Sequence, residues 1–295
     1  MSVILERTLT FLLEQPGISN REIRAVHLNN YFTVVELDDT NVGACMSNYL
    51  LPHENLVERQ SAIRSMLCQD PLLLRFTEAH AASDGVARSI RAATINALSS
   101  PFLRVGEDSF FTVQNNFPHH FFKEIKYAVV IGFGGFLDYL VRHTSVQKLH
   151  VSDLLYQSRR AEMDTKIMNK KIARYHKERP DIELSVSDGS DTGEHLRKAD
   201  FVTITGSTLT NNTLEQLLLS ARNCKKIILQ GQSASIHPKE LFASGVHLVA
   251  TTLKTRDVAK AAFWDPTGNA LRPFLEGDLP WIYIWPKSPQ DGNLK

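Results

Sequence analysis

The spacing of apolar residues changes about a third of the way along the 295-residue chain. Before that point, a helical period over residues 3–14 ends at Pro16 and Gly17, and β-branched and aromatic residues then predict strands at 23–28, 31–37 and 42–46. Turn-forming residues separate these strands at 29–30 and 38–41. A helical period returns over residues 54–96. Residues 1–100 are therefore predicted to form a small α+β domain, in which a β-meander precedes helices.

Strand-like and helical segments alternate in the rest of the chain, after a connector at residues 101–125 that is rich in Phe. Strands are predicted at 127–131, 149–152, 182–187, 201–205, 226–230 and 246–250, and helices at 136–143, 158–177 and 214–220. Such an alternation is typical of a doubly wound parallel sheet. Residues 126–295 are therefore predicted to form a Rossmann-like α/β domain with a mostly parallel sheet. Ligands of such sheets bind outside the carboxyl ends of the strands, near the switch point.

A glycine-rich turn, made of Gly132, Phe133, Gly134 and Gly135, follows the first strand of this domain. Glycine permits a tight turn and lets a ligand approach the backbone, and the helix that follows directs free N–H groups toward the same place. The full GxGxxG pattern is absent, because Leu137 stands three positions after Gly134. The turn is predicted to bind a ligand, and a tight turn without a ligand is the alternative.

Acidic residues come directly after the next two strands. Asp153 stands 21 positions after Gly132, where a carboxylate can accept hydrogen bonds from both ribose hydroxyls of a nucleoside. A helix N-cap is the alternative role for Asp153. Asp188 and Gly189 follow the third strand, where they form either a contact to an adenine amino group or an ordinary turn. Their order at successive strand ends predicts a site for one adenosine.

A polar tract at residues 205–213 follows the fourth strand. Thr205, Gly206 and Ser207 are predicted to contact the ligand, because hydroxyl groups there could bind a carboxylate or an amine. No catalytic residue can be assigned from the sequence, and Thr205, Ser207 and Asn211 are the candidates. The alternative for the end of the tract is capping of the helix at 214–220.

Composition and charge narrow the class of protein. The 33 basic and 32 acidic residues give no electrostatic reason to expect nucleic acid or an anionic membrane as partner. No apolar run reaches the ~20 residues of a membrane-spanning helix, and no secretory leader is predicted. The three scattered cysteines, Cys45, Cys68 and Cys224, favour a reducing cytoplasm. Neither CxxC nor HExxH is present, so no metal site is predicted.

Three segments resemble a known family. The tract ITGSTLTNNTLE at residues 204–215 is similar to the TGTTLVNGTLE signature of the heavy-metal chelation family, a family of proteins of unknown function. The ATINAL segment at 93–98 resembles a helix of that family's N-terminal domain, and GQS at 231–233 resembles its GPS turn, with Gln232 in place of Pro. The resemblance covers most of the chain and implies an enolase-N-terminal-like domain followed by a Rossmann-like domain.

The glycine-rich turn departs from that family, whose members tend to have bulkier residues there. Together with Asp153 and Asp188, the turn looks more like a site for S-adenosylmethionine (SAM). The layout is similar to that of nicotianamine synthases and of the SAM cyclases that make azetidine-2-carboxylate. This second resemblance implies chemistry on the aminocarboxypropyl arm of SAM instead of its methyl group.

Three functions follow as hypotheses. The first is a SAM-using enzyme of small-molecule biosynthesis, which either cyclises the aminocarboxypropyl arm and releases methylthioadenosine or transfers the methyl group. The second is a non-catalytic protein that binds a metal or metal chelate, suggested by the family and by eleven histidines. The third, an NAD(P) dehydrogenase, lacks the full glycine pattern and an evident catalytic His or Lys–Tyr pair. We expect a small-molecule substrate, and the oligomeric state stays open, with a homodimer as one alternative.

Overall fold

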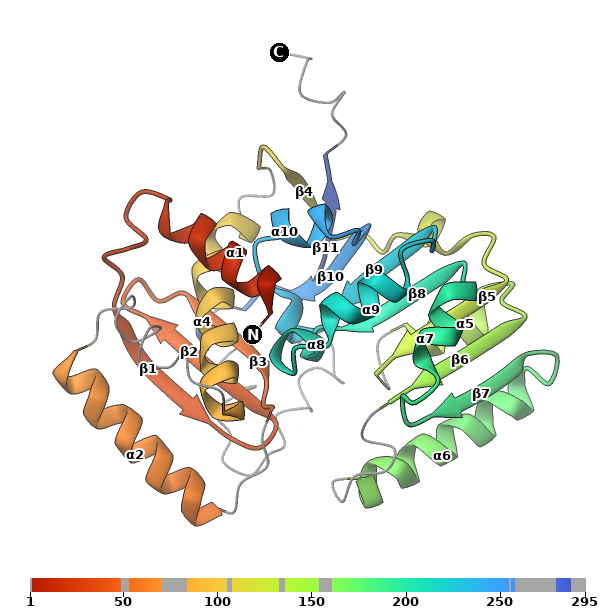
Figure 1. Cartoon of the computed structure of the whole chain (residues 1–295), viewed down its shortest axis with the longest axis horizontal. Helices are drawn as coiled ribbons and strands as arrows, with labels where there is room; N and C mark the ends of the chain where they lie inside the picture. Colours follow the sequence, from red (N-terminus) through yellow and green to blue (C-terminus); the bar gives the residue numbers. More distant parts are fainter. Residues whose placement is uncertain are drawn as a thin grey trace.

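The computed structural model describes residues 2–48, 53–70, 84–104, 108–132, 136–153, 161–254, 256–257 and 280–287. Within these ranges, the chain forms a three-stranded antiparallel sheet and an eight-stranded, mostly parallel sheet. Figure 1 shows the smaller sheet, with the helices around it, on one side of the larger sheet. The predicted fold class, a Rossmann-like α/β sheet preceded by a small α+β unit, is confirmed.

The N-terminal unit begins with a helix and continues as a β-meander. The hydroxyl of Ser2 caps the first helix by accepting a hydrogen bond from the N–H of Leu5. The turn at Asn29 is held by its side-chain Oδ1, which accepts from the N–H groups of Tyr31 and Phe32. The elements of the unit are α1 (Val3–Leu13), β1 (Ile23–Leu28), β2 (Phe32–Leu37), β3 (Val42–Met46), α2 (His53–Gln69) and α4 (Gly85–Arg104).

Helix α4 packs against β3 so closely that their backbones touch at Gly43. A Cβ atom added at Gly43 would lie 2.0 Å from the carbonyl oxygen of Ala93. The helical period predicted over residues 54–96 ends too early, because the helix continues through Pro101 to Arg104. Proline removes one backbone hydrogen bond near the end of the helix, while burial of Leu103 anchors the last turn.

The large sheet has the strand order β4-β11-β10-β9-β8-β5-β6-β7. From β7 to β10, neighbouring strands are parallel and follow the doubly wound order of a Rossmann sheet, with its switch point between β5 and β8. The six parallel strands are β5 (Tyr127–Ile131), β6 (Lys148–Ser152), β7 (Glu183–Ser187), β8 (Phe201–Thr205), β9 (Lys226–Gln230) and β10 (Leu248–Thr252).

Helices cover both faces of this sheet. One face packs against α5 (Leu137–His143), α6 (Ala161–Glu178) and the 3-10 helix η1 (His119–Phe122). The other face packs against α7 (Thr192–Lys198), α9 (Leu214–Ser220) and α10 (Lys239–Ala243). The apolar residues on this second face form one continuous cluster with those of α1, β1, β2 and α4. The two units are therefore packed together through a shared core.

Two strands that the sequence did not reveal extend the large sheet. Strand β4 (Phe111–Gln114) lies within the predicted connector, and β11 (Trp281–Pro286) lies near the end of the chain. Strand β11 pairs antiparallel with both β10 and β4. The aromatic residues Phe117, Phe121 and Phe122 pack beside this addition against Trp285 and Phe136. Phe122 belongs to the buried core of this face, and Phe117 and Phe121 pack against it.

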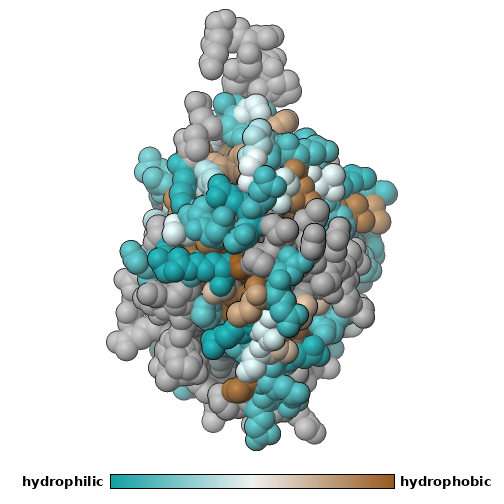
Figure 2. All heavy atoms as spheres, turned by 90° about the vertical axis from the view of Figure 1, so that its left-hand side faces the viewer, coloured by the Kyte–Doolittle hydropathy of each residue, from teal (hydrophilic) through white to brown (hydrophobic). Residues whose placement is uncertain are grey.

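The outer side of the N-terminal unit, turned toward the viewer in Figure 2, is covered mainly by hydrophilic side chains in its coloured parts. Apolar residues appear there as separate spots, as on the surface of an ordinary globular protein. Among the described residues, no helix is both long enough and apolar enough to cross a membrane.

Substituting Gly43 with alanine is expected to lower the free energy of unfolding by at least about 3 kcal/mol, because the new methyl group would overlap the backbone of α4. Chemical denaturation of purified protein would measure the loss. Gly17→Ala is the control. Gly17, unlike Gly43, has a positive φ, but no atom lies within 4 Å of the added Cβ, so the substitution should cost only the backbone strain of about 1–2 kcal/mol. Equal losses in the two variants would contradict the packing argument.

Candidate functional site at the carboxyl edge of the large sheet

The switch point of the sheet brings the glycine-rich turn beside the polar tract. Strands β5 and β8 pair in register up to Ile131 and Ile204, so Gly132 and Thr205 leave the sheet side by side. Gly132 has a φ of 85°, and a Cβ atom there would lie 2.7 Å from Cγ2 of Thr205. Glycine is therefore required by both the backbone and the space. The rest of the predicted turn, Phe133, Gly134 and Gly135, lies outside the described residues.

The two predicted acidic residues lie at the ends of the neighbouring strands. The N–H of Gly132 donates to the carbonyl of Ser152 over 2.8 Å, and the N–H of Asp153 donates to the carbonyl of Ser187 over 3.1 Å. These bonds continue the sheet registers, so Gly132, Asp153 and Asp188 follow three adjacent strands. The structure thus brings these three predicted residues to one edge.

Asp188 is ionised and held in a turn. Its Oδ1 accepts a hydrogen bond of 3.1 Å from the N–H of Ser190, and hydrogen bonding from Ser190 lowers the pKa of its carboxyl. Gly189, also predicted to contact the ligand, has a φ of 103°, which only glycine adopts readily. The Asp-Gly pair therefore forms a turn, as one alternative proposed.

The polar tract folds as a short helix, α8 (Ser207–Thr210), that the sequence analysis did not predict. Much of its bonding capacity is used within the tract. The hydroxyl of Thr208 donates to the carbonyl of Thr205, and that of Ser207 donates to Oγ1 of Thr205. Asn211 accepts from both the N–H and the hydroxyl of Thr213 through Oδ1. Of the three catalytic candidates, Asn211 therefore has a local structural role, Thr205 lies beside Gly132 at the switch point, and Ser207 is bonded to Thr205.

Gly206 lies against the neighbouring loop. A Cβ atom at Gly206 would lie 2.6 Å from the backbone nitrogen of Ala234, in the 3-10 helix η3 (Gln232–Ala234). Gly206 is also buried, so the absence of a side chain allows the two loops to pack closely; its predicted ligand contact stays a prediction. Residues that follow β8 and β9 are thus in contact with each other.

The N-terminal unit closes the carboxyl edge on the side of β8 and β9. Asn48 donates from Nδ2 to the carbonyl of Thr210 over 2.9 Å, and the N–H of Met46 donates to the hydroxyl of Ser233 over 2.9 Å. The side chain of Asn96 donates to the carbonyl of Gln232. The part of the edge beyond this contact is formed by the ends of β5, β6 and β7.

A lysine is fully buried at the same contact. Lys254 donates from Nζ to the carbonyl of Gln232 over 3.0 Å and also contacts the hydroxyl of Ser235. Burial lowers the pKa of Lys254 to about 7. Lys254 lines a small cavity with Asn96 and Ser100 from α4. Its side-chain nitrogen is therefore held between the two units by oxygen atoms of the loop after β9.

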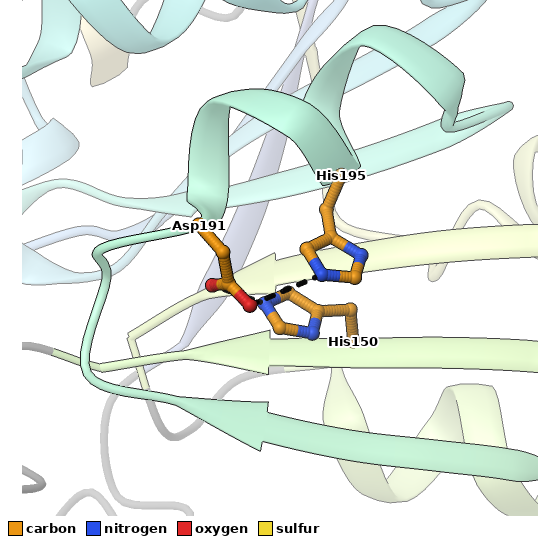
Figure 3. A group of neighbouring side chains, drawn as sticks. All are labelled: His150, Asp191 and His195. Carbon is orange, nitrogen blue, oxygen red and sulfur yellow. Dashed lines mark hydrogen bonds and ion pairs between the residues drawn. The ribbon is translucent and has the colours of Figure 1, made fainter.

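Three side chains that the sequence analysis did not single out meet beside β6 (Figure 3). His150 lies on β6, Asp191 directly precedes α7, and His195 lies on α7. One nitrogen or oxygen atom from each lies within 4.8 Å of the others. Burial, and then the neighbouring His195, lower the pKa of His150 to about 4. Hydrogen bonding from Ser187 lowers the pKa of Asp191.

Part of this cluster could have been found from the sequence, because polar and apolar residues alternate along two of the parallel strands. Strand β6 reads KLHVS and β7 reads ELSVS, so polar residues alternate with apolar ones in strands of a parallel sheet. Strands buried on both faces usually read as continuous apolar runs. The polar face of β6 and β7 therefore marks a local site. Asp191 and His195 are four positions apart, which places them on the same side of a helical turn.

Comparisons with known proteins agree with the fold. Residues 122–262 match the model of the DUF364 family, described as "Putative heavy-metal chelation". The resemblance noted from the sequence is therefore confirmed over this part of the chain. No curated protein matches the sequence.

Two solved structures resemble nearly the whole chain. A DUF364 protein of unknown function from Pyrococcus horikoshii is 15% identical, with a TM-score of 0.62. Another, from Desulfitobacterium hafniense DCB-2, is 16% identical, with a TM-score of 0.63. Each alignment covers 96% of this chain and 98% of the other. At these identities the likeness shows a common fold for the two units.

The buried Lys254 predicts how stability depends on pH. Its pKa is about 7 in the folded protein and 10.5 for an ordinary lysine, as in the unfolded chain, so between these values the unfolded chain binds a proton that the folded chain does not. The free energy of unfolding should therefore rise with pH in this window, by up to about 1.4 kcal/mol per pH unit. Urea denaturation between pH 7 and 8.5 would measure the slope.

Lys254→Met should remove this contribution, so its stability should rise less with pH than that of the wild type. Lys225→Met is the control, because Lys225 is exposed. Parallel curves for the wild type and Lys254→Met would show that Lys254 keeps an ordinary pKa in the folded state.

Proposed function

We propose that the carboxyl edge formed by β5, β6 and β7 binds the adenosine part of SAM, and that the protein is a SAM-using enzyme of small-molecule biosynthesis. The observation that carries the proposal is the position of Gly132, Asp153 and Asp188 after three adjacent strands. In a doubly wound sheet this is the place where nucleotides bind. Asp153 would accept hydrogen bonds from the ribose hydroxyls, and Asp188 from the adenine amino group.

The amino acid end of SAM would extend toward Thr205 and Ser207. Thr205 adjoins Gly132 across the switch point, and both Thr205 and Ser207 are partly exposed. Their hydroxyl groups could bind the carboxylate or the amine of the ligand. An enzyme that acts on the aminocarboxypropyl arm has to hold the amino acid end of SAM, because the amine must be oriented toward the carbon that it attacks.

Two reactions are compatible with such binding. In cyclisation, the neutral amine of SAM attacks its own γ-carbon, the bond from that carbon to sulfur breaks, and methylthioadenosine leaves with the electron pair. The ring nitrogen then loses a proton to a polar group or to water. Positioning would supply most of the rate, because both reacting atoms belong to one molecule. In methyl transfer, a second substrate accepts the methyl group and S-adenosylhomocysteine remains.

Isothermal titration calorimetry with SAM is the test of binding. The wild type should bind SAM below millimolar concentration, and Asp153→Asn should weaken binding about 10- to 100-fold, because hydrogen bonds to a charged carboxylate are lost. Glu194→Gln is the matched control: it removes a carboxylate that pairs with Lys198 on α7, away from the strand ends. Its affinity should equal that of the wild type.

Absence of heat at millimolar SAM, or equal affinities in the wild type and Asp153→Asn, would refute the proposal. Thermal unfolding of each variant checks that it is folded. Mass spectrometry after incubation with SAM separates the two reactions, because methylthioadenosine indicates cyclisation and S-adenosylhomocysteine indicates methyl transfer.

A further inference from the structure

We propose that His150, Asp191 and His195 bind a divalent transition-metal ion, with Nε2 of each histidine and the carboxylate of Asp191 as ligands (Figure 3). The inference uses residues outside the proposed SAM site and does not depend on SAM. The family description mentions metal chelation, but the proposal rests on the geometry of these three side chains.

The distances between the candidate ligand atoms suit a small ion. Nε2 of His150 lies 3.5 Å from Oδ1 of Asp191, and Nε2 of His195 lies 3.3 Å from Oδ2 of the same residue. Ligands at 2.0–2.2 Å from a tetrahedral zinc ion are separated from each other by about 3.4 Å. An ion could therefore be bound with small movements of the side chains.

The other nitrogen of each imidazole already has a partner. Nδ1 of His150 lies 2.9 Å from the hydroxyl of Ser185, and Nδ1 of His195 is hydrogen bonded to the hydroxyl of Tyr127. When Nδ1 donates to these hydroxyls, the lone pair is on Nε2, which faces Asp191. Such outer partners set the tautomer and orientation of histidines that bind metals.

One adjustment is required on binding. The two imidazole rings are stacked, with centroids 3.5 Å apart and planes 4° from parallel, so their Nε2 lone pairs lie in two separate parallel planes and cannot both point at one ion. His150 is 1% exposed and fixed on a strand, whereas the side chain of His195 is 22% exposed on a short helix. A tilt of the His195 ring would therefore let both lone pairs converge on one ion. The hydroxyl of Ser187, 3.1 Å from Nε2 of His150, can remain bonded to Asp191.

The ligand types identify the class of ion. Two imidazoles and one carboxylate suit Zn²⁺, Co²⁺ and similar first-row ions better than Ca²⁺ or Mg²⁺, which prefer oxygen ligands. Three protein ligands leave a fourth position for water or another molecule, as in metal sites with an open coordination position. The side chain of Asp191 is 44% exposed, so the site can be reached from solvent.

Zinc binding to the purified full-length protein, after treatment with a chelator, tests the site by calorimetry. The wild type should bind one Zn²⁺ tightly, and His195→Gln and Asp191→Asn should each weaken binding at least about 10-fold. Loss of a residue that only orients a metal ligand already costs that much affinity, so loss of a ligand should cost no less. His176→Gln is the control, because His176 is exposed on α6, and its affinity should be unchanged.

Co²⁺ gives a second measurement, because its visible spectrum reports nitrogen coordination. The wild type loaded with Co²⁺ should show absorption bands that are lost in His195→Gln and kept in His176→Gln. The proposal is overturned if the wild type binds no Zn²⁺ below millimolar concentration, or if tight binding and the Co²⁺ bands persist in folded His195→Gln and Asp191→Asn. The three side chains would then be a hydrogen-bonded cluster. Asp191 is exposed, so Asp191→Asn should fold even if His195→Gln does not.

Discussion

Backbone groups at the carboxyl edge of a parallel sheet need hydrogen-bond partners wherever they are buried. The source of these partners decides which part of the edge is covered by protein and which part is left for a ligand. Beyond β8 and β9 the partners come from the N-terminal unit. Asn48 donates to the carbonyl of Thr210, and Asn96 donates to the carbonyl of Gln232. The ends of β8 and β9 are therefore covered by the N-terminal unit. The other part of the edge, after β5, β6 and β7, provides the candidate ligand contacts.

Most of the fold could be predicted because its strands are short, apolar and bounded by turn signals. The segments at 127–131, 201–205 and 226–230 coincide with β5, β8 and β9. Strand β10 begins and ends two residues later than predicted, since apolar residues continue on both sides of the boundary. Strands β4 and β11 escaped prediction because their pairing joins segments far apart in the sequence. The end of α4 was misplaced because Pro101 is tolerated in its last turns.

The site was predictable only where its residues follow strands. Asp153 and Asp188 could be placed at one edge because parallel strands end together. The polar tract was harder to interpret, because hydroxyl groups such as that of Thr208 bond as well to a nearby carbonyl as to a ligand. The cluster of His150 and His195 depends on how α7 packs over β6, and no local spacing specifies that packing.

The apolar cluster shared by the two units has a consequence for cooperativity. Leu12 and Ile95 of the N-terminal unit belong to the same cluster as Val202 and Leu229 of the large sheet. Loss of either partner would expose apolar surface on the other, at a cost of about 25 cal/mol per Å². The two units can be told apart in the sequence, but neither is expected to be stable without the other. They should therefore unfold in a single transition.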